Sequence, residues 1–266
     1  MKAMILAAGM GTRMLPLTQH CPKPLLPVAG IPLLEHWLIK LERISAITQI
    51  IINAAYLSER IRAYIHARHN AVPIWVNVEP EPLETAGALR AVLPDLGQAP
   101  FLLINGDVFC NVPLSTWLEE ASRRLQANAA CEGVCMMVNN PSHHLSGDFC
   151  IVDEGLLTTK PEQHTECASY TFSGVSVLSP KLIRQYPQAR KKFALREVFD
   201  WAMARRALYA NYYAGYWLDV GTPERLGQLE QDVQANPYLL AHLNTETKNA
   251  LKPMHKNMHK KMNKEP

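Results

Sequence analysis

Short apolar runs alternate with helical patterns through the first hundred residues of this chain, and this alternation constrains its fold most strongly. The runs read as buried strands, because short apolar segments bounded by turn residues are typical of parallel sheets. Between them, apolar residues recur at i, i+3 and i+4, the period of an amphipathic helix. Strands are expected at 2–7, 49–54, 73–78 and 101–105, and helices at 32–44, 57–65 and 85–93. The alternation predicts right-handed crossovers and a mostly parallel sheet covered by helices on both faces.

The pattern becomes more mixed after about residue 130. Strand-like runs occur at 132–138, 147–152 and 171–177, and the segments between them look like loops except for a helical pattern at 195–206. This half is expected to close an antiparallel edge of the sheet. Thr85 is a plausible N-cap for the helix that begins near it, because its hydroxyl oxygen can accept a hydrogen bond from the first turn.

The domain organisation is predicted from composition. A length of 266 residues permits one large α/β domain or two small ones. No composition break divides residues 1–235, which are therefore expected to form one domain. Residues 236–266 are expected to be an extension without fixed structure after residue 244, because that segment is poor in aliphatic residues and rich in lysine.

Charge and cysteine content exclude several classes of protein. The formal net charge is +3, and much of it lies in the C-terminal tail, so charge gives little support to nucleic-acid binding. None of the six cysteines forms a CxxC pair, which favours reduced, partly buried thiols in a cytoplasmic protein. The apolar run at the N-terminus is too short to span a membrane, and no later run reaches 18 apolar residues. We therefore expect neither nucleic acid nor a membrane as a partner.

A glycine-rich loop follows the first expected strand. Residues 8–13 read Ala-Gly-Met-Gly-Thr-Arg, and such glycines let backbone N–H groups approach a phosphate. A dinucleotide-binding turn would need a third glycine where Met14 stands, and an acid about 20 residues on at the end of a second strand. The nearest such acid, Glu35, falls inside a helical pattern. The Gly-Lys-Ser/Thr of a P-loop is also absent.

A third interpretation of the loop uses two cations. Arg13 ends the loop, and Lys23 lies between Pro22 and Pro24, which stiffen its backbone. Two cations positioned in this way suit a triphosphate with several negative charges. Taken singly, however, each would more often be an ordinary surface residue.

Several ordered motifs together resemble the sugar-phosphate nucleotidyltransferase family. The motifs are residues 6–18 (LAAGMGTRMLPLT), 22–25 (PKPL), 84–87 (ETAG), 105–108 (NGDV) and 217–223 (WLDVGTP). The resemblance covers roughly residues 1–233 and implies a Rossmann-like α/β fold with a mixed, mostly parallel sheet flanked by helices. It implies catalytic roles for Arg13 and Lys23. The residues expected to bind the nucleotide are Gly9, Gly11, Thr12, Arg13, Lys23, Glu84 and Gly87.

Two aspartates are expected to hold a metal ion. Asp107 follows an apolar strand, where parallel strands present ligands, and Asp219 follows an apolar pair and precedes Gly221. Thr222-Pro223-Glu224 then reads as an N-cap, a proline at the first helical position and an acid in the first turn. Mg²⁺ is usually bound by one or two carboxylates together with substrate phosphates. In the family, the aspartates that match Asp107 and Asp219 are the metal ligands.

The sugar side is expected to include five residues: Asn105, Gly147, Asp148, Lys160 and Trp217. The Gly-Asp-Phe at 147–149, preceded by His-His, resembles the N-acetylmuramate-1-phosphate uridylyltransferases of cell-wall recycling. One departure concerns Lys160, because many relatives carry Glu-Lys-Pro where this chain has Thr-Lys-Pro.

The predicted reaction joins an NTP to a sugar 1-phosphate and releases pyrophosphate, with Mg²⁺ as the cofactor. UTP and N-acetylmuramate 1-phosphate are the preferred substrates, and GTP with mannose 1-phosphate is the alternative pair. Two other classes stay open at this point. One is an NAD-dependent oxidoreductase, and the other is a non-catalytic regulatory relative that binds a nucleotide sugar.

Overall fold

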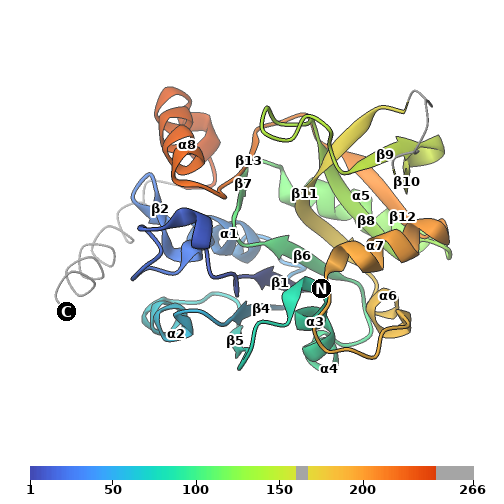
Figure 1. Cartoon of the computed structure of the whole chain (residues 1–266), viewed down its shortest axis with the longest axis horizontal. Helices are drawn as coiled ribbons and strands as arrows, with labels where there is room; N and C mark the ends of the chain where they lie inside the picture. Colours follow the sequence, from blue (N-terminus) through green and yellow to red (C-terminus); the bar gives the residue numbers. More distant parts are fainter. Residues whose placement is uncertain (160–166, 244–266) are drawn as a thin grey trace. The chain divides into compact units, whose positions relative to one another are not determined.

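The computed structural model describes residues 1–159 and 167–243, which divide into two compact units (Figure 1). Of the described residues, unit 1 comprises those within Met1–Ile5, Glu79–Asn105 and Val112–Gly215, and unit 2 comprises those within Leu6–Val78, Gly106–Asn111 and 216–243. Each unit therefore takes its residues from segments far apart in the chain, which explains why composition shows no break along the sequence. The expected disorder after residue 244 and the lysine at position 160 lie outside the described residues.

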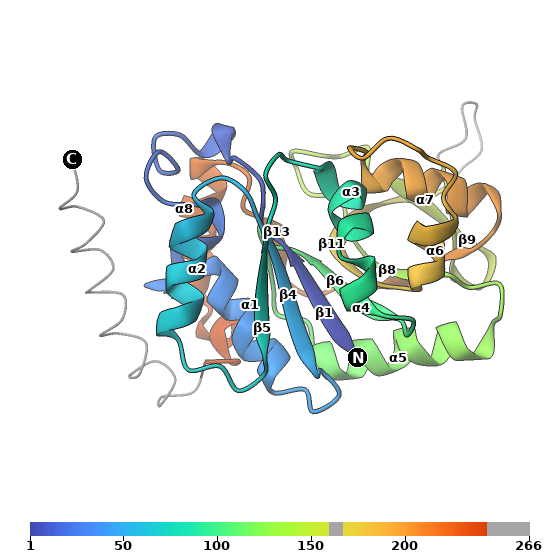
Figure 2. The same cartoon turned by 90° about the horizontal axis from the view of Figure 1, so that it is seen from below.

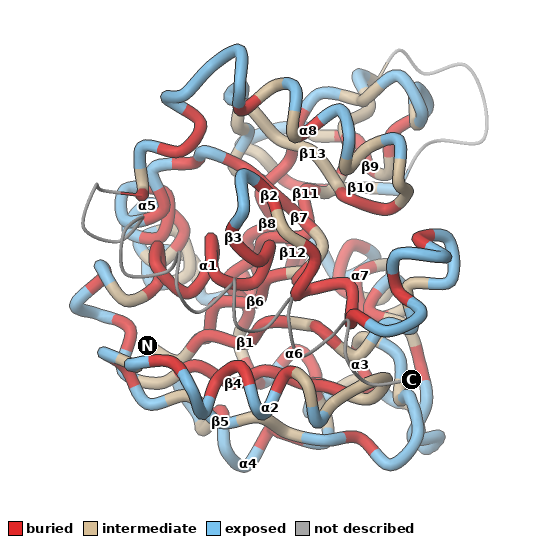
Figure 3. Tube along the Cα trace, turned by 90° about the vertical axis from the view of Figure 1, so that its left-hand side faces the viewer, coloured by how far each residue is buried: buried red, intermediate tan, exposed pale blue. Residues whose placement is uncertain are grey.

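Unit 1 is built on a mixed sheet. In spatial order its strands are β1 (Lys2–Leu6), β6 (Phe101–Asn105), β11 (Ser169–Leu178), β8 (Gly133–Val138), β12 (Leu208–Tyr212), β10 (Leu156–Thr158) and β9 (Phe149–Val152). β11 runs antiparallel to both β6 and β8, whereas β12 runs parallel to β8. The expected antiparallel part of the sheet is therefore confirmed. β8 is buried along its whole length, as Figure 3 shows in red.

Helices cover both faces of these strands. They are α3 (Glu84–Ala91), α4 (Leu93–Leu96), α5 (Leu114–Ala127), α6 (Pro180–Gln185) and α7 (Leu195–Ala204). In Figure 2, α5 lies on one side of the β8 and β11 strands, and α6 and α7 lie on the other. The expected α/β architecture with a sheet flanked by helices is confirmed, although α5 and α6 had not been predicted from the sequence.

Unit 2 contains the strand–helix–strand predicted from the first apolar runs. β4 (Gln49–Ala54) leads through α2 (Ser58–Ala67) into β5 (Ile74–Val78), which pairs parallel to β4. The remaining elements are η1 (Thr12–Met14), η2 (Lys23–Leu25), β2 (Pro27–Val28), β3 (Ile31–Pro32), α1 (Leu33–Glu42), β7 (Val108–Cys110), β13 (Trp217–Asp219), α8 (Pro223–Ala235) and η4 (Pro237–Leu240). None of the helices described in either unit is long and apolar enough to cross a membrane.

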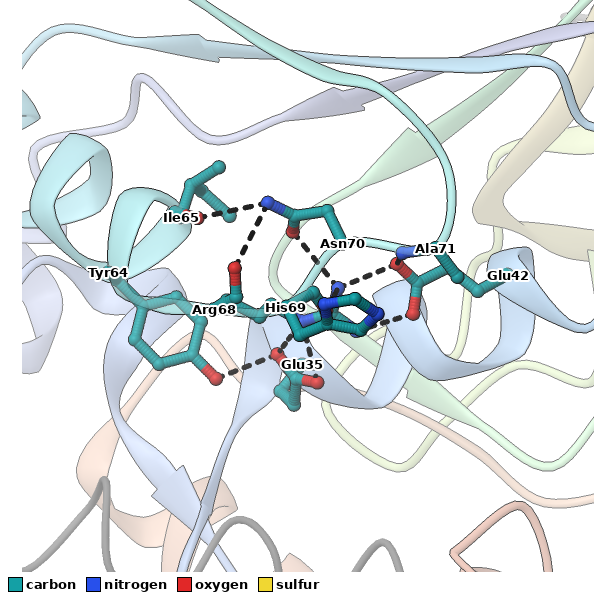
Figure 4. Close-up of polar contacts among 8 residues, drawn as sticks. All are labelled: Glu35, Glu42, Tyr64, Ile65, Arg68, His69, Asn70 and Ala71. Atoms are coloured by element: carbon teal, nitrogen blue, oxygen red, sulfur yellow. Dashed lines mark hydrogen bonds and ion pairs between the residues drawn. The ribbon is translucent and has the colours of Figure 1, made fainter.

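A buried ion network joins α1 to the end of α2 in unit 2 (Figure 4). Arg68 Nε lies 2.8 Å from Glu35 Oε2, and Arg68 Nη2 lies 2.6 Å from Glu42 Oε2. The Tyr64 hydroxyl donates a hydrogen bond of 2.7 Å to Glu35. Burial raises the pKa of Glu35, and the bonds from Arg68 and Tyr64 oppose that rise. Because Glu35 is held in the core, it is not placed to bind a ribose, which argues against the dinucleotide-binding interpretation.

The prediction that Thr85 caps its own helix is wrong. α3 begins at Glu84, so Thr85 lies inside the helix, and its Oγ1 accepts a hydrogen bond of 2.7 Å from the N–H of Leu195. Leu195 is the first residue of α7, whose N-cap residue is Ala194 and has no side-chain oxygen. Thr85 therefore supplies to the first turn of α7 the acceptor that the alanine at its N-cap cannot supply.

Candidate active site

The glycine loop is held by its neighbours in unit 2. Gly11 has a φ of +64°, and a Cβ at this position would lie 2.9 Å from Thr18 Cγ2. The buried Thr18 hydroxyl donates a hydrogen bond of 2.8 Å to the Gly11 carbonyl oxygen. Gly11 is thus required both by its left-handed backbone and by close packing. Gly9, Thr12 and Arg13 bracket this position on the surface, so their side of the loop is open to a ligand.

Hydrogen bonds tie the start of this loop to the segment that carries Asp107. The N–H of Gly106 donates to the carbonyl oxygen of Leu6 at 2.8 Å. The N–H of Ala7 donates to the Asn53 side chain, also at 2.8 Å, in a buried contact. Two of the motifs recognised in the sequence therefore begin side by side, although about a hundred residues separate them in the chain.

Lys23 and Asp107 form an ion pair. The Lys23 side chain projects from η2, a single 3₁₀ turn that Pro22 precedes and that contains Pro24. Its Nζ lies 2.6 Å from Asp107 Oδ2, and its side chain is 11% exposed. The structure therefore brings together a predicted phosphate-binding cation and a predicted metal ligand.

The two predicted metal ligands lie at the same end of a two-stranded ribbon. β7 and β13 pair antiparallel with Asp219 opposite Val108, and the N–H of Val220 donates to the Asp107 carbonyl oxygen at 2.7 Å. Asp107 and Asp219 are thus one register position apart, although they come from segments more than a hundred residues apart. The prediction of an N-cap at Thr222 is confirmed, because its side chain accepts a hydrogen bond from the N–H of Arg225.

Arg225 contacts the predicted metal ligand Asp219 and had not been predicted from the sequence. Its Nη1 lies 2.9 Å from Asp219 Oδ1 and 2.8 Å from Asp219 Oδ2, and the Arg225 side chain is 15% exposed. The sequence predicted the start of α8 but gave no signal that this side chain turns back toward the aspartate. The one sequence feature connected with this contact is the glycine at position 221. In the structure, a Cβ at Gly221 would overlap Arg225 Nη2.

Helix α1 supports β7 through two further residues that the sequence analysis missed. The indole N–H of Trp37 donates to the Val108 carbonyl oxygen at 2.7 Å, and Lys40 Nζ donates to the Cys110 carbonyl oxygen. Burial lowers the pKa of Lys40, whose ammonium lies 5.0 Å from the Trp37 ring. The spacing of i and i+3 places both donors on one face of α1, where they hold the strand that follows Asp107.

The donor set fits a divalent cation that shares its ligands with phosphate. Asp107 and Asp219 supply hard carboxylate oxygens, and their side chains are 36% and 27% exposed. Across the described residues, no group of three or more His, Cys, Asp or Glu side chains could hold a metal. A closed, all-protein site is therefore not formed there, whereas one or two carboxylates are what Mg²⁺ needs beside substrate phosphates.

The predicted nucleotide-side residues of unit 1 lie at the start of α3. Glu84 is exposed and has a φ of +62°. Gly87 is buried, and a Cβ there would overlap the carbonyl oxygen of Lys191. Gly87 was predicted from the family resemblance to bind the nucleotide, and that contact stays a prediction. In the structure, its missing side chain makes room for the chain's own backbone, whose Phe193 carbonyl accepts from the N–H of Gly87 at 3.2 Å.

The predicted sugar-side residues are distributed over both units. Asp148 Oδ2 accepts a hydrogen bond of 2.8 Å from the N–H of Phe172, and Oδ1 lies 3.1 Å from His144 Nε2. Asp148 therefore organises its own loop in unit 1, and its contact with a sugar stays a prediction. Gly147 has a φ of +61°, and a Cβ there would overlap the Asn140 side chain.

The other sugar-side predictions fall in three places. Asn105 ends β6 in unit 1 and packs against Gly174, where a Cβ would lie 2.9 Å from Asn105 Cβ. Trp217 is half-buried at the start of β13 in unit 2. Lys160 lies outside the described residues.

Comparisons with known proteins agree with these motifs. The family model described as nucleotidyl transferase matches residues 2–236. The chain is 36% identical over 233 residues to an N-acetylmuramate alpha-1-phosphate uridylyltransferase from Neisseria meningitidis serogroup B, covering 86% of this chain and 97% of the relative. It is 30% identical over 235 residues to the mannose-1-phosphate guanylyltransferase catalytic subunit beta from Danio rerio, covering 84% of this chain and 62% of that protein.

A solved structure supports the fold. The UDP-glucose pyrophosphorylase from Acinetobacter baumannii superimposes with a TM-score of 0.70 at 17% identity, covering 90% of this chain and 95% of that one. At this identity the likeness concerns the fold alone. The family assignment rests instead on the family model and on the Neisseria relative, of which 97% is covered. Together they show that the chain belongs to the nucleotidyl transferase family.

Proposed function

We propose that this protein transfers a uridylyl group from UTP to N-acetylmuramate 1-phosphate, forming UDP-N-acetylmuramate and pyrophosphate. The support for the reaction class is the family match over residues 2–236. The choice of substrates rests on one observation, the 36% identity to the Neisseria uridylyltransferase over 97% of that enzyme's length. Such a reaction would serve the recycling of cell-wall sugars in the cytoplasm.

The reaction needs no covalent enzyme intermediate. A phosphate oxygen of the sugar 1-phosphate attacks the α-phosphorus of UTP, the bond from that phosphorus to the bridging oxygen breaks, and pyrophosphate leaves with the electron pair. The enzyme's contribution is to position the two substrates and to neutralise the charge that develops. Arg13, exposed at the end of the glycine loop, and Lys23, fixed between two prolines, would bind the triphosphate.

Asp107 and Asp219 would hold Mg²⁺ together with phosphate oxygens. When bound there, Mg²⁺ supplies positive charge to the reacting phosphates and helps to align them. The two carboxylates are held at one end of the β7–β13 ribbon, and Trp37 and Lys40 brace β7 from α1. When Lys23 binds the triphosphate, it exchanges its contact with Asp107 for one with a phosphate oxygen.

The second candidate is the transfer of a guanylyl group from GTP to mannose 1-phosphate. The observation that favours it is the 30% identity to the guanylyltransferase subunit, although the chain spans only 62% of that protein. The two remaining classes receive less support. An oxidoreductase would need an accessible acid where Glu35 is buried against Arg68. A non-catalytic relative would be expected to have lost Arg13, Lys23, Asp107 or Asp219, and all four are present.

A substrate matrix tests the proposal. The purified full-length chain is incubated with each of the four NTPs and with N-acetylmuramate, mannose, glucose or N-acetylglucosamine 1-phosphate, and pyrophosphate release is measured. We expect the highest kcat/KM for UTP with N-acetylmuramate 1-phosphate. A higher value for GTP with mannose 1-phosphate would select the second candidate. Absence of pyrophosphate with every pair would contradict nucleotidyl transfer itself.

A further inference from the structure

Each predicted metal ligand already carries a cation in contact with its carboxylate. Lys23 Nζ lies 2.6 Å from Asp107 Oδ2, and Arg225 Nη1 lies 2.8 Å from Asp219 Oδ2. All four side chains belong to unit 2, and the two cations are only 11% and 15% exposed. Two negative and two positive charges therefore cancel within the part of unit 2 where a divalent cation would bind.

The position of Arg225 is built into the turn that follows Asp219. The Thr222 side chain caps α8 by accepting from the N–H of Arg225, which sets the first helical turn beside the aspartate. Arg225 Nη1 then contacts both carboxylate oxygens of Asp219, at 2.9 and 2.8 Å. A cation that binds Asp219 must therefore share the carboxylate with this guanidinium or displace it.

Gly221 makes the space that the guanidinium occupies. A Cβ at Gly221 would overlap Arg225 Nη2 and would lie 3.3 Å from Asp219 Oδ2. Gly221 is not among the residues with positive φ, so the backbone conformation does not require glycine at this position. The absence of a side chain is instead required by the contact between Arg225 and Asp219. The glycine is thus a second observation, beside the N-cap at Thr222, that the turn before α8 is shaped to hold Arg225 against Asp219.

We propose that Arg225 is a positioning residue that acts as the counter-ion of Asp219 and keeps a free divalent cation from binding before the nucleotide. The inference rests on the proposed function, in which the metal is shared between these carboxylates and a triphosphate. A free cation approaching the neutral set of four charges gains little attraction, because each aspartate is already compensated. A triphosphate brings its own negative charge and oxygen ligands and offers Lys23 a new partner. Metal and nucleotide are therefore taken up together.

The test measures Mn²⁺ binding to the full-length chain in the absence of nucleotide, by the electron paramagnetic resonance signal of free Mn²⁺. Arg225→Met removes the charge but keeps a long side chain, and we expect it to bind Mn²⁺ about tenfold more tightly than the unmodified chain. Arg225→Lys keeps the charge and should stay within about threefold of the unmodified chain. Arg196→Met is the matched control, because Arg196 is paired at 2.8 Å with Asp200, which is not a predicted metal ligand, and it should change nothing.

Gly221→Ala tests the geometry without changing any charge. The new methyl group would push the guanidinium away from Asp219, so Mn²⁺ binding should become several-fold tighter although the net charge is unchanged. Adding Asp219→Asn to Arg225→Met should abolish the gain, because the carboxylate that is uncovered would be gone. The thermal midpoint of each variant shows whether it is folded, and Gly221→Ala carries the test if Arg225→Met is not.

Two results would overturn the proposal. One is Mn²⁺ binding to Arg225→Met or Gly221→Ala that is no tighter than to the unmodified chain. The other is a gain that survives Asp219→Asn, because Mn²⁺ would then be binding elsewhere. Both are measured without UTP or sugar phosphate. A failure of the substrate matrix would therefore contradict the proposed function and leave the Mn²⁺ result standing, and the reverse also holds.

Discussion

The indole N–H of Trp37 donates a hydrogen bond of 2.7 Å to the carbonyl oxygen of Val108, the residue that follows the predicted metal ligand Asp107. Val108 is 2% exposed, so this carbonyl has little access to water if the bond is lost. The bond therefore connects helix α1 directly to the backbone that positions a carboxylate. Because an unsatisfied buried acceptor costs about 1–3 kcal/mol, the strand should shift or loosen when the donor is removed.

Trp37→Phe tests this connection. The variant keeps an aromatic ring but loses the N–H donor, and we expect kcat to fall by about tenfold, on the scale of one lost hydrogen bond. The Mg²⁺ concentration that gives half-maximal activity should rise, while the KM for the sugar phosphate should change little. Both are obtained from pyrophosphate release as Mg²⁺ is varied.

Trp117→Phe is the matched control for that measurement. Trp117 is also buried, but its Nε1 has no hydrogen-bond partner among the described residues. Its replacement should leave kcat and the Mg²⁺ requirement unchanged. If the two variants behaved alike, the effect of Trp37 would be one of packing and not of the bond to Val108.

Replacing either predicted metal ligand should abolish most of the activity. Asp107→Asn and Asp219→Asn keep the shape of the side chain and remove its charge, and each should lower kcat by about 100-fold or more, as is typical of losing an electrostatic stabiliser. Pyrophosphate release at limiting Mg²⁺ measures the loss. Asp200→Asn, at an exposed pair with Arg196, is the control and should be fully active. Near-normal turnover of both Asn variants would remove the metal assignment.

Arg68→Met should destabilise unit 2 strongly. It leaves the buried Glu35 and Glu42 without their shared cation, and removal of one partner from a buried ion pair typically costs about 3–5 kcal/mol. Urea unfolding measures the free energy of unfolding. Arg62→Met is the control, since Arg62 and Glu59 form an exposed pair that contributes at most about 1 kcal/mol.

The destabilisation of Arg68→Met should grow with pH. Burial already raises the pKa of Glu35, and loss of Arg68 raises that pKa further. The folded variant then binds a proton that the unfolded chain releases, so its stability falls as pH rises from the pKa of the unfolded state toward that of the folded state. The loss relative to the unmodified chain should be smaller at pH 5.5 than at pH 8, and a loss independent of pH would show that Glu35 does not take up this proton.

Cys167 should be the thiol that reacts first with iodoacetamide. All six cysteines are free, as expected from the sequence, and five are buried. Burial raises the pKa of Cys21 and of Cys131 to about 11, so at pH 8 only about one in a thousand of these thiols is ionised. Mass spectrometry of the folded chain should show a single adduct, located at Cys167. Early modification of Cys21 would contradict its described burial.

The first half of the fold was predictable because its elements obey local rules. β4 was predicted with the bounds that it has, since three consecutive isoleucines, Ile50 to Ile52, strongly favour a buried strand. Thr222, Pro223 and Glu224 likewise start α8 through interactions within one turn. Where contacts between distant segments decide the outcome, such rules fail. Thr85 has the chemistry of a cap, but the helix that uses it begins at Leu195.

The candidate site shows the same division. The glycine and aspartate motifs predict Gly11, Asp107 and Asp219, because a tight turn and a charged residue after an apolar strand can be recognised from the sequence alone. Arg225 could not be predicted, because its contact with Asp219 depends on the space left by Gly221 and on the direction in which α8 starts. Trp37 lies inside the helix predicted at 32–44, but the partner of its indole N–H, the carbonyl oxygen of Val108, lies 71 residues away and is found only in the structure.

The six-residue segment Gly106–Asn111, which contains Asp107, belongs to unit 2 although the segments before and after it belong to unit 1. This order of segments has a consequence for synthesis on the ribosome. The segment's pairing partner, Trp217–Asp219, leaves the ribosome about 110 residues later, which at 5–20 residues per second is a delay of roughly 5–20 s. Throughout that interval β7 has no strand opposite it, while α1, already synthesised, can bond to its carbonyl groups through Trp37 and Lys40. Helix α1 can therefore hold the nascent strand through these two hydrogen bonds until β13 has been synthesised.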